Sequence, residues 1–305
     1  MSKVSIIIPG RNEQYMSKTV DEVFAKATGE VEVIVSLDGT TTWPLPRKRP
    51  NLVIINKAES EGMRPAINSA AKVATGKYLM KLDAHCAIGK GFDEILQKDF
   101  HDDRWIVIPR RYGPPDVNTW KPNTNNPIDY HYLTCPWIHP HYFAMHDLPW
   151  MSRTKTRFDI LIDETMTFQG PCWFMSANNF HNRLHGMQTE IYGNFCAEMQ
   201  ELSFKTWLGG GRVIVNKNTW YAHLGDFPGR PRYIRIREQI LGWGNSARYW
   251  TGNKWEARIH DFDWLIERFW PLPMKDTLHR GERYPWPENW RDYYEGKLGY
   301  MEGVK

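Results

Sequence analysis

The sequence lacks any apolar run long enough to cross a membrane, a segment that needs about 20 apolar residues. The N-terminal run "VSIIIPG" ends at Pro9, Gly10 and Arg11, which makes it too short for the core of a signal peptide. Cysteine is scarce, and none of the four is spaced as CxxC: Cys86, Cys135, Cys172 and Cys196. We therefore expect reduced thiols, no membrane span, and a cytoplasmic protein of a bacterial cell or a virus-infected host cell.

The chain of 305 residues also lacks a strong excess of one charge, because its formal net charge is only +4. Residues 226–258 carry seven basic and three acidic residues, a difference equal to the whole net charge. Aromatic residues are interleaved with them: Tyr233, Trp243, Tyr249, Trp250 and Trp255. Such a segment suits nucleic acid or sugars. It is equally typical of a solvated helix whose apolar side packs on the core.

Apolar runs of strand length alternate with stretches of helical spacing in the first third of the chain. Strands are predicted at 4–10, 31–38, 52–57 and 77–83, and helices at 15–29 and 64–76. Strands separated by helices favour a mostly parallel sheet that binds ligands at the carboxyl ends of its strands. Asp38 and Asp83 lie at such ends.

The alternation weakens after the strand predicted at 105–110, in about 50 residues rich in Pro, Asn, His and aromatics. We expect a long insertion or a loop on the acceptor side there. A zinc cluster of Cys135, His139, His141 and His146 is disfavoured, because structural zinc ligands normally show tighter, repeated spacing. A helix at 197–210, a strand at 212–217 and a helix at 232–250 are predicted next.

The triplet "DAH" places Asp83 and His85 on the same side of an extended chain. A carboxylate and an imidazole together can hold a divalent cation such as Mn²⁺ and leave positions for diphosphate oxygens. A third ligand must then come from elsewhere in the chain. The alternative is a pair of solvated residues at a strand end, because a D-x-H triplet arises about once by chance in such a chain.

Three segments resemble the nucleotide-sugar glycosyltransferases of the GT-A fold, and most closely the catalytic domain of the polypeptide N-acetylgalactosaminyltransferases. The first is "SIIIPGRNE", with Asn12 and Glu13. The second is "EGMRPAINSAAKVATGKYLMKLDAHC", and the third is "EMQELSFKTWLGGGRVIVNKNTWYAH". The resemblance, which covers residues 3–226, implies an α/β fold with a Rossmann-like, mostly parallel central sheet and flanking helices.

The resemblance also implies a domain plan and a donor. Residues 1–226 would form the GT-A catalytic domain, with 1–110 as the nucleotide-binding half and 111–226 as the acceptor-side half. Residues 227–305 would form a helical, Trp-rich and basic extension packed on that domain. The expected donor is a UDP-sugar, bound with Mn²⁺ or Mg²⁺.

Most of the candidate site residues follow from the resemblance, position by position, whereas Arg232 and Arg235 belong to the basic and aromatic segment beyond it. His223 would complete a metal site with Asp83 and His85, and Glu198 and Asp83 would be catalytic. The donor would contact Pro9, Arg11, Glu13, Asp38, Arg64, Asp83, Ala84 and Trp173. Acceptor contacts are expected at Trp137, Phe195, Trp207, Arg232 and Arg235. For Asp38 the alternative is a turn or cap residue, and for Arg64 a residue of a first helical turn.

Two departures from the resembled family affect the chemistry. Ser60 stands where the family has an arginine, so the diphosphate needs another cation, for which Arg64 and Arg11 are candidates. Met199 stands where the inverting relatives have a second carboxylate that acts as a general base. Unless Glu190 or Glu201 replaces that base, we expect transfer with retention.

The acceptor stays open among several classes. Candidates are a hydroxymethylated pyrimidine in DNA, as in phage genome modification, and a serine or threonine of a protein. An inverting family 2 enzyme that acts on a glycan or a lipid-linked acceptor is an alternative. A non-catalytic sugar- or nucleic-acid-binding protein is another.

Overall fold

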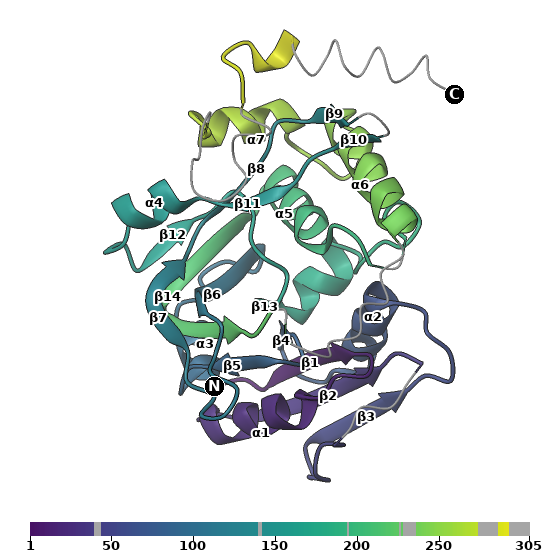
Figure 1. Ribbon diagram of the computed structural model, residues 1–305, viewed down its shortest axis with the longest axis vertical. Coiled ribbons are helices and arrows are strands. Elements are labelled where there is room, and N and C mark those ends of the chain that lie inside the picture. Colours follow the sequence, from purple (N-terminus) through teal and green to yellow (C-terminus); the bar gives the residue numbers. More distant parts are fainter. Residues whose placement is uncertain are drawn as a thin grey trace.

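The computed structural model describes residues 1–39, 44–139, 142–193, 195–225, 227, 236–273 and 286–292. At 137–139, 142–144 and 236–239 it describes the backbone alone. Figure 1 shows a central sheet with helices on its faces, helices α6 and α7 toward the end of the molecule opposite α1, and α5 between them and the sheet. None of the helices in these ranges is both long and apolar enough to span a bilayer.

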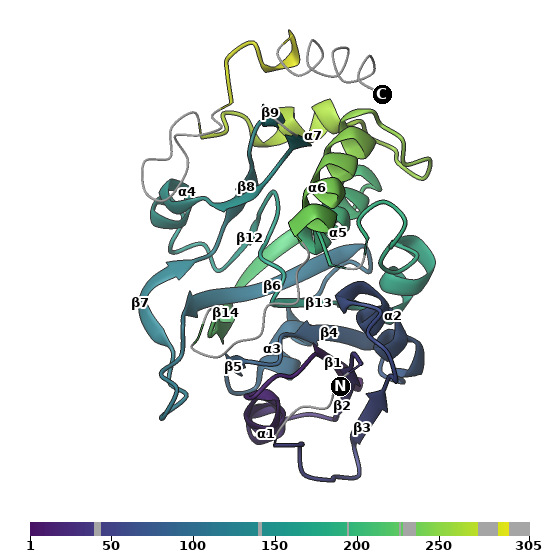
Figure 2. The ribbon, with the colours of Figure 1, turned by 45° about the vertical axis from the view of Figure 1, so that its right-hand side comes forward.

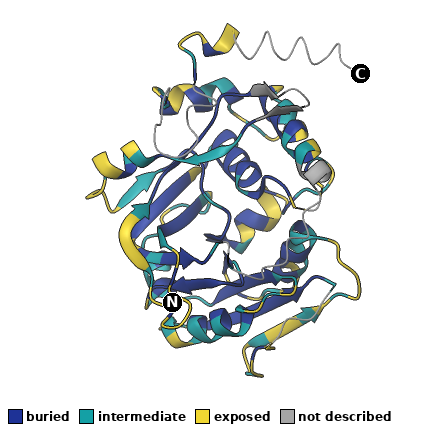
Figure 3. Cartoon of the chain, in the orientation of Figure 1, coloured by how far each residue is buried: buried dark blue, intermediate teal, exposed yellow. Residues whose placement is uncertain are grey.

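The N-terminal half is the predicted parallel sheet. Strands β1 (Val4–Gly10), β2 (Val31–Leu37), β3 (Leu52–Asn56) and β4 (Tyr78–Leu82) lie in the order β4-β1-β2-β3, and all three neighbouring pairs are parallel. The Val and Ile side chains of β1 and β2 are buried on both faces, as parallel strands between helices require. Figure 3 shows that the edge strand β3, in contrast, is partly exposed.

Helices α1 (Met16–Lys26) and α2 (Met63–Val73) flank these strands. Helix α1 buries Met16, Thr19, Val20 and Val23, which recur at helical spacing and so form one apolar face. Helix α2 packs on β1 and β2. A third helix, α3 (Phe92–Lys98), follows the short strand β5 (Cys86–Ile88).

The rest of the main sheet mixes directions. Strand β13 (Cys172–Ser176) lies antiparallel between β4 and β6 (Trp105–Gly113). Strand β14 (Arg212–His223) runs parallel to β6, and β12 (Ile162–Glu164) closes the edge antiparallel to β14. The strand predicted at 212–217 therefore continues to His223. Its last residues also pair with β5, which brings the end of β14 to the end of β4.

The stretch after residue 110, expected as a long insertion or a loop, contains short strands instead. Strand β7 (Asn123–Ile128) pairs antiparallel with β6, β8 (His131–Leu133) with β11 (Asp147–Pro149), and β9 (Trp137–His139) with β10 (Tyr142–Ala144). Helix α4 (Met151–Thr156) follows them, and a π-helical turn η1 (Asn179–Arg183) comes after β13. The expectation of a loop was wrong because backbone pairing, which composition does not reveal, holds these strands together.

Helix α5 (Glu198–Leu208) is almost entirely buried beneath the C-terminal helices (Figure 3). Helices α6 (Ile236–Thr251) and α7 (Phe262–Phe269) pack on it, as the turned view in Figure 2 also shows. The rings of Trp250 and Phe262 both contact the ring of Phe204 in tilted orientations, and Trp250 and Trp255 are buried. Within residues 226–258, Trp250 and Trp255 therefore face the core. This is what the alternative of a solvated helix with one apolar side predicts. The domain boundary at 226 stays a prediction.

Candidate metal centre

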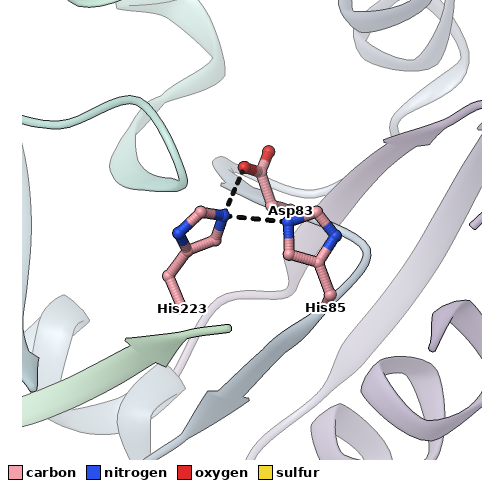
Figure 4. Close-up of side chains that lie close together, drawn as sticks. All are labelled: Asp83, His85 and His223. Atoms are coloured by element: carbon pink, nitrogen blue, oxygen red, sulfur yellow. Dashed lines mark hydrogen bonds and ion pairs between the residues drawn. The ribbon is translucent and has the colours of Figure 1, made fainter. Parts of the chain in front are cut away.

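Three side chains predicted as metal ligands come together at the ends of three strands (Figure 4). Asp83 follows β4, His85 precedes β5, and His223 ends β14. The antiparallel register of β14 with β5 places His223 opposite Cys86, beside His85. The amide of Leu224 donates to the carbonyl oxygen of His85 at 3.1 Å and holds the two segments together. The sheet itself therefore positions all three ligands.

The spacing of the ligand atoms fits one cation. One ligand atom from each residue lies within 4.8 Å of the others. The Nε2 atoms of His85 and His223 are 2.9 Å apart, and His223 Nε2 is 3.3 Å from Asp83 Oδ2. Two ligand atoms on adjacent corners around a divalent cation, each at about 2.1 Å, lie about 3 Å from each other. A carboxylate with two imidazoles suits Mn²⁺ or a similar borderline cation.

The surroundings of the two histidines favour metal ligation through their Nε2 atoms. Glu13 Oε2 lies 3.0 Å from His85 Nδ1, which orients the ring so that Nε2 faces the other ligands. Burial lowers the pKa of His223 to about 4, which keeps this imidazole neutral at pH 7. For Asp83, burial opposes ionisation, but the positive charge of Lys81 and the hydrogen bond with His223 hold its pKa well below the usual value. Glu13, expected to touch the donor, here supports a ligand.

A buried lysine that the sequence interpretation missed joins this centre to Glu198. Lys81 Nζ lies 2.7 Å from Asp83 Oδ1 and 3.3 Å from Glu198 Oε2. The other oxygen of Glu198 accepts a hydrogen bond of 2.8 Å from Trp173 Nε1. Burial raises the pKa of Glu198 despite the nearby charge of Lys81. Trp173 itself is fully buried and supports Glu198 through this hydrogen bond, and its contact with the donor stays a prediction.

Asp38 holds the loop that leads into α2. Its carboxylate accepts hydrogen bonds from the hydroxyl of Ser60 at 2.7 Å and from the amides of Glu61 and Gly62 at 2.7 and 3.0 Å. Gly39, with a φ of 74°, makes this approach possible, because a Cβ there would lie 2.3 Å from the amide nitrogen of Ser60. The turn-residue alternative thus describes the contacts of Asp38, and its role toward uridine stays a prediction.

Arg64 is a core residue and does not face the metal centre. The whole residue is buried, and its guanidinium pairs with the buried carboxylate of Glu201. Arg64 Nε donates to the carbonyl oxygen of Cys196 at 2.9 Å, and Nη1 donates to that of Gln188 at 2.8 Å. These partners enclose the guanidinium, and the role of Arg64 toward the diphosphate stays a prediction.

The acceptor-side predictions divide into three groups. Trp207 is buried and donates from Nε1 to the carbonyl oxygen of Met166 at 3.1 Å, and its contact with the acceptor stays a prediction. Phe195 is 44% exposed and stays a candidate. Arg232, Arg235 and the side chain of Trp137 lie outside the described residues.

Of the donor candidates near β1, Pro9 and Ala84 are buried and Arg11 is partly exposed; their roles stay predictions.

The disfavoured zinc cluster gains no support. Cys135 is a buried free thiol, as are Cys86, Cys172 and Cys196. His141 and the side chain of His139 lie outside the described part of the chain. Within that part, Asp83, His85 and His223 are the group of potential metal ligands that the structure brings together.

Arg111 is a second cation that the sequence interpretation missed. It lies on β6 opposite Tyr221 of β14, two residues before His223, and its charge adds to the effect of burial in lowering the pKa of His223. Arg110 points to the other face, where it binds Asp129 at 2.8 and 2.9 Å. Arg111 Nε is buried, and no described residue forms a hydrogen bond or ion pair with this guanidinium. The sequence analysis missed Arg111 because only the strand register shows that it lies next to the end of β14.

Known proteins resemble the chain in sequence. The profile of "Glycosyl transferase family 2" matches residues 5–183. Mouse polypeptide N-acetylgalactosaminyltransferase 3 is 27% identical over 172 residues, which are 56% of this chain and 27% of that protein. Human polypeptide N-acetylgalactosaminyltransferase 6 is 26% identical over 236 residues, which cover 70% of this chain and 36% of that protein. The chain thus spans about a third or less of these relatives.

Solved structures resemble the fold. GalNAc-T7, crystallised with UDP, GalNAc and Mn²⁺, superposes with a TM-score of 0.56 at 18% identity, over 77% of this chain and 46% of that chain. Residues 1–349 of S. aureus TarS, in complex with UDP-GlcNAc, superpose with a TM-score of 0.57 at 16% identity, over 99% of this chain and 76% of that chain. The predicted GT-A fold, with its mixed and mostly parallel sheet, is confirmed.

Proposed function

Because the chain belongs to glycosyl transferase family 2, we propose that it transfers a sugar from a UDP-sugar to an acceptor hydroxyl with the help of Mn²⁺ or Mg²⁺. The observation that carries this proposal is the cluster of Asp83, His85 and His223 at the carboxyl end of the sheet. Ligands of doubly wound sheets bind at that end. The donor sugar is proposed to be an N-acetylhexosamine, because the relatives are N-acetylgalactosaminyltransferases and TarS was crystallised with UDP-GlcNAc.

In this proposal the residues of the chain have separate tasks. Asp83, His85 and His223 hold the cation, which when bound offsets the negative charge that develops on the departing diphosphate. Glu13 keeps the ring of His85 in place. Glu198 is held rigidly by Trp173 and Lys81 beside the metal centre, and its proposed task is to help position the sugar. This rigidity supports transfer, because a preorganised group needs no rearrangement when the bond to the sugar breaks.

Retention is the proposed stereochemical outcome. Met199 offers no proton acceptor, and Glu201, one of the two candidate replacements, is buried and held by Arg64 and Lys205. Glu190 is exposed and remains the other candidate base. Proton NMR of the first-formed product measures the anomeric configuration. An inverted product would contradict this proposal without affecting the proposed metal site.

For the acceptor we favour a serine or threonine hydroxyl of a polypeptide, because the curated relatives are polypeptide transferases. The case for DNA depended on aromatic residues between the bases of 226–258. Trp250 and Trp255 are buried and therefore do not offer their rings to a nucleic acid. That observation weakens the case for genome modification.

The direct test supplies UDP-N-acetylhexosamines with Mn²⁺ and compares three acceptors: serine- and threonine-containing peptides, oligosaccharides, and hydroxymethylated duplex DNA. Mass spectrometry is expected to detect one added sugar on the peptides, and chelation with EDTA is expected to abolish the addition. If no UDP-sugar is transferred or hydrolysed, the proposed activity is wrong. Transfer to DNA alone would instead support the viral alternative.

Arg111→Gln is expected to weaken UDP binding about tenfold in the presence of Mn²⁺, as loss of a charge-assisted hydrogen bond would. We infer this role because Arg111 lies near His223 and makes no ion pair with a described residue, whereas the diphosphate needs a cation. Calorimetric titration with UDP measures the change. Arg183→Gln, at an exposed position on η1, is the matched control and should bind UDP like the wild type. Equal affinities for both variants would rule out this role.

A further inference from the structure

Lys81 lies at the junction of the metal centre and Glu198, and its side chain is 1% exposed. An ammonium group has three N–H donors, and Lys81 has three acceptors within reach. These are the carbonyl oxygen of Gly170 at 2.7 Å, Asp83 Oδ1 at 2.7 Å and Glu198 Oε2 at 3.3 Å. Each donor therefore has its own acceptor, and the ammonium group is fixed in place.

Strand geometry explains why these groups meet. Lys81 and Asp83 are two residues apart at the end of β4, so their side chains point to the same face. Trp173 of β13 stands opposite Lys81 in the antiparallel register. Lys81 and Trp173 therefore reach Glu198, at the start of α5, from neighbouring strands, and each binds a different carboxylate oxygen.

We propose that Lys81 is a positioning residue that joins Asp83 to Glu198. It leaves Asp83 only one carboxylate oxygen for the cation, and it lowers the affinity of the site for that cation. Asp83 Oδ1 is occupied by Lys81, whereas Oδ2 faces His223. A cation shared with the two histidines thus meets Oδ2 alone. The inference rests on the proposed metal-dependent function, and it assigns to Lys81 a role that involves no contact with the donor.

The charges predict an order of metal affinities. In the wild type, the positive charge of Lys81 offsets one of the two carboxylates, Asp83 and Glu198. Lys81→Met leaves both carboxylates uncompensated and frees Asp83 Oδ1. It is therefore expected to bind Mn²⁺ about tenfold more tightly or more, because like charges a few ångströms apart repel strongly in a buried site. Glu198→Gln removes one negative charge and should bind Mn²⁺ more weakly than the wild type.

The double variant Lys81→Met/Glu198→Gln restores the net charge of the wild type and should restore an affinity near that of the wild type. The intensity of the electron paramagnetic resonance signal of free Mn²⁺, recorded without donor, measures all four affinities. Turnover of the UDP-sugar by Lys81→Met is expected to fall about tenfold or more although its metal binds more tightly, since Glu198 loses its fixed partner. A side chain that only fills space would not separate the two readouts in this way.

Two outcomes would overturn the inference. In one, Lys81→Met binds Mn²⁺ and turns over donor like the wild type. In the other, its metal affinity and its turnover fall together while circular dichroism shows an intact fold. If Lys81→Met does not fold, Lys81→Arg and the double variant decide: the inference requires Lys81→Arg to bind Mn²⁺ no more tightly than the wild type, and the double variant to bind it more tightly than Glu198→Gln alone. Failure of the wild type to bind Mn²⁺ would instead reject the proposed function.

Discussion

Asp83→Asn is expected to abolish measurable Mn²⁺ binding and to lower the kcat/KM of sugar transfer about 10³-fold or more. The asparagine keeps the size of the side chain but removes the charge that faces the cation. Oδ2 of Asp83 is the carboxylate oxygen next to His223, and Oδ1 is bound to Lys81. An amide oxygen is a much weaker ligand, and stabilisation of charge on the leaving group is the main demand of the proposed sugar transfer. Transfer is measured by product mass, and metal binding by the paramagnetic signal of free Mn²⁺.

The control for this variant is Asp261→Asn. The Asp261 side chain is 65% exposed, pairs with Arg258 at the surface, and makes no capping hydrogen bond at the start of α7. It should bind Mn²⁺ and transfer sugar like the wild type. If Asp83→Asn folds and also retains full activity, Asp83 is not a metal ligand. If it loses activity but keeps Mn²⁺ binding, the cation is held elsewhere.

The sequence predicts the parallel half of the fold well, because the chemistry of that half is local. Each strand from β1 to β4 is a continuous Val- and Ile-rich run or a short apolar run next to a helical pattern. The insertion of β13 between β4 and β6 was not foreseen. Its residues "CWFMS" form a short apolar run that does not reveal its strand partners. The short strands after residue 110 were missed for a similar reason, since they pair through backbone groups in a segment without apolar alternation.

The candidate site follows the same division. The spacing of Asp83 and His85 suggested a metal site, the resemblance over long blocks supported it and added His223, and the structure brings the three together. Lys81 was missed because a lysine within an apolar strand has no signal for its partners. Arg64 was assigned to the diphosphate, yet its partner Glu201 lies 137 residues further along the chain. The role of a buried charged residue depends on its partner, which often lies in a distant segment of the chain. Sequence patterns do not reveal such contacts.

Glu201 carries the largest expected effect on stability, because it is the carboxylate between two buried cations. It pairs with Arg64, lies 2.6 Å from Lys205 Nζ, and accepts a hydrogen bond of 2.9 Å from the amide of Gln188. Arg64, Glu201 and Lys205 are each at most 1% exposed. Removing one partner of a buried pair leaves an uncompensated charge, which typically costs about 3–5 kcal/mol.

Glu201→Gln is therefore expected to lower the free energy of unfolding by about 3–5 kcal/mol, measured by urea denaturation. Asp261→Asn, which breaks an exposed pair, should lower it by less than about 1 kcal/mol. Arg64→Met should cost less than Glu201→Gln, because Glu201 then keeps Lys205. If Arg64→Met lowered the free energy of unfolding more than Glu201→Gln, the contacts of the arginine, and not the charge balance, would be what stabilises this region. Arg64 also fixes the carbonyl oxygen of Cys196, two residues before Glu198, so loss of this network should lower sugar transfer at temperatures where the variant is still folded.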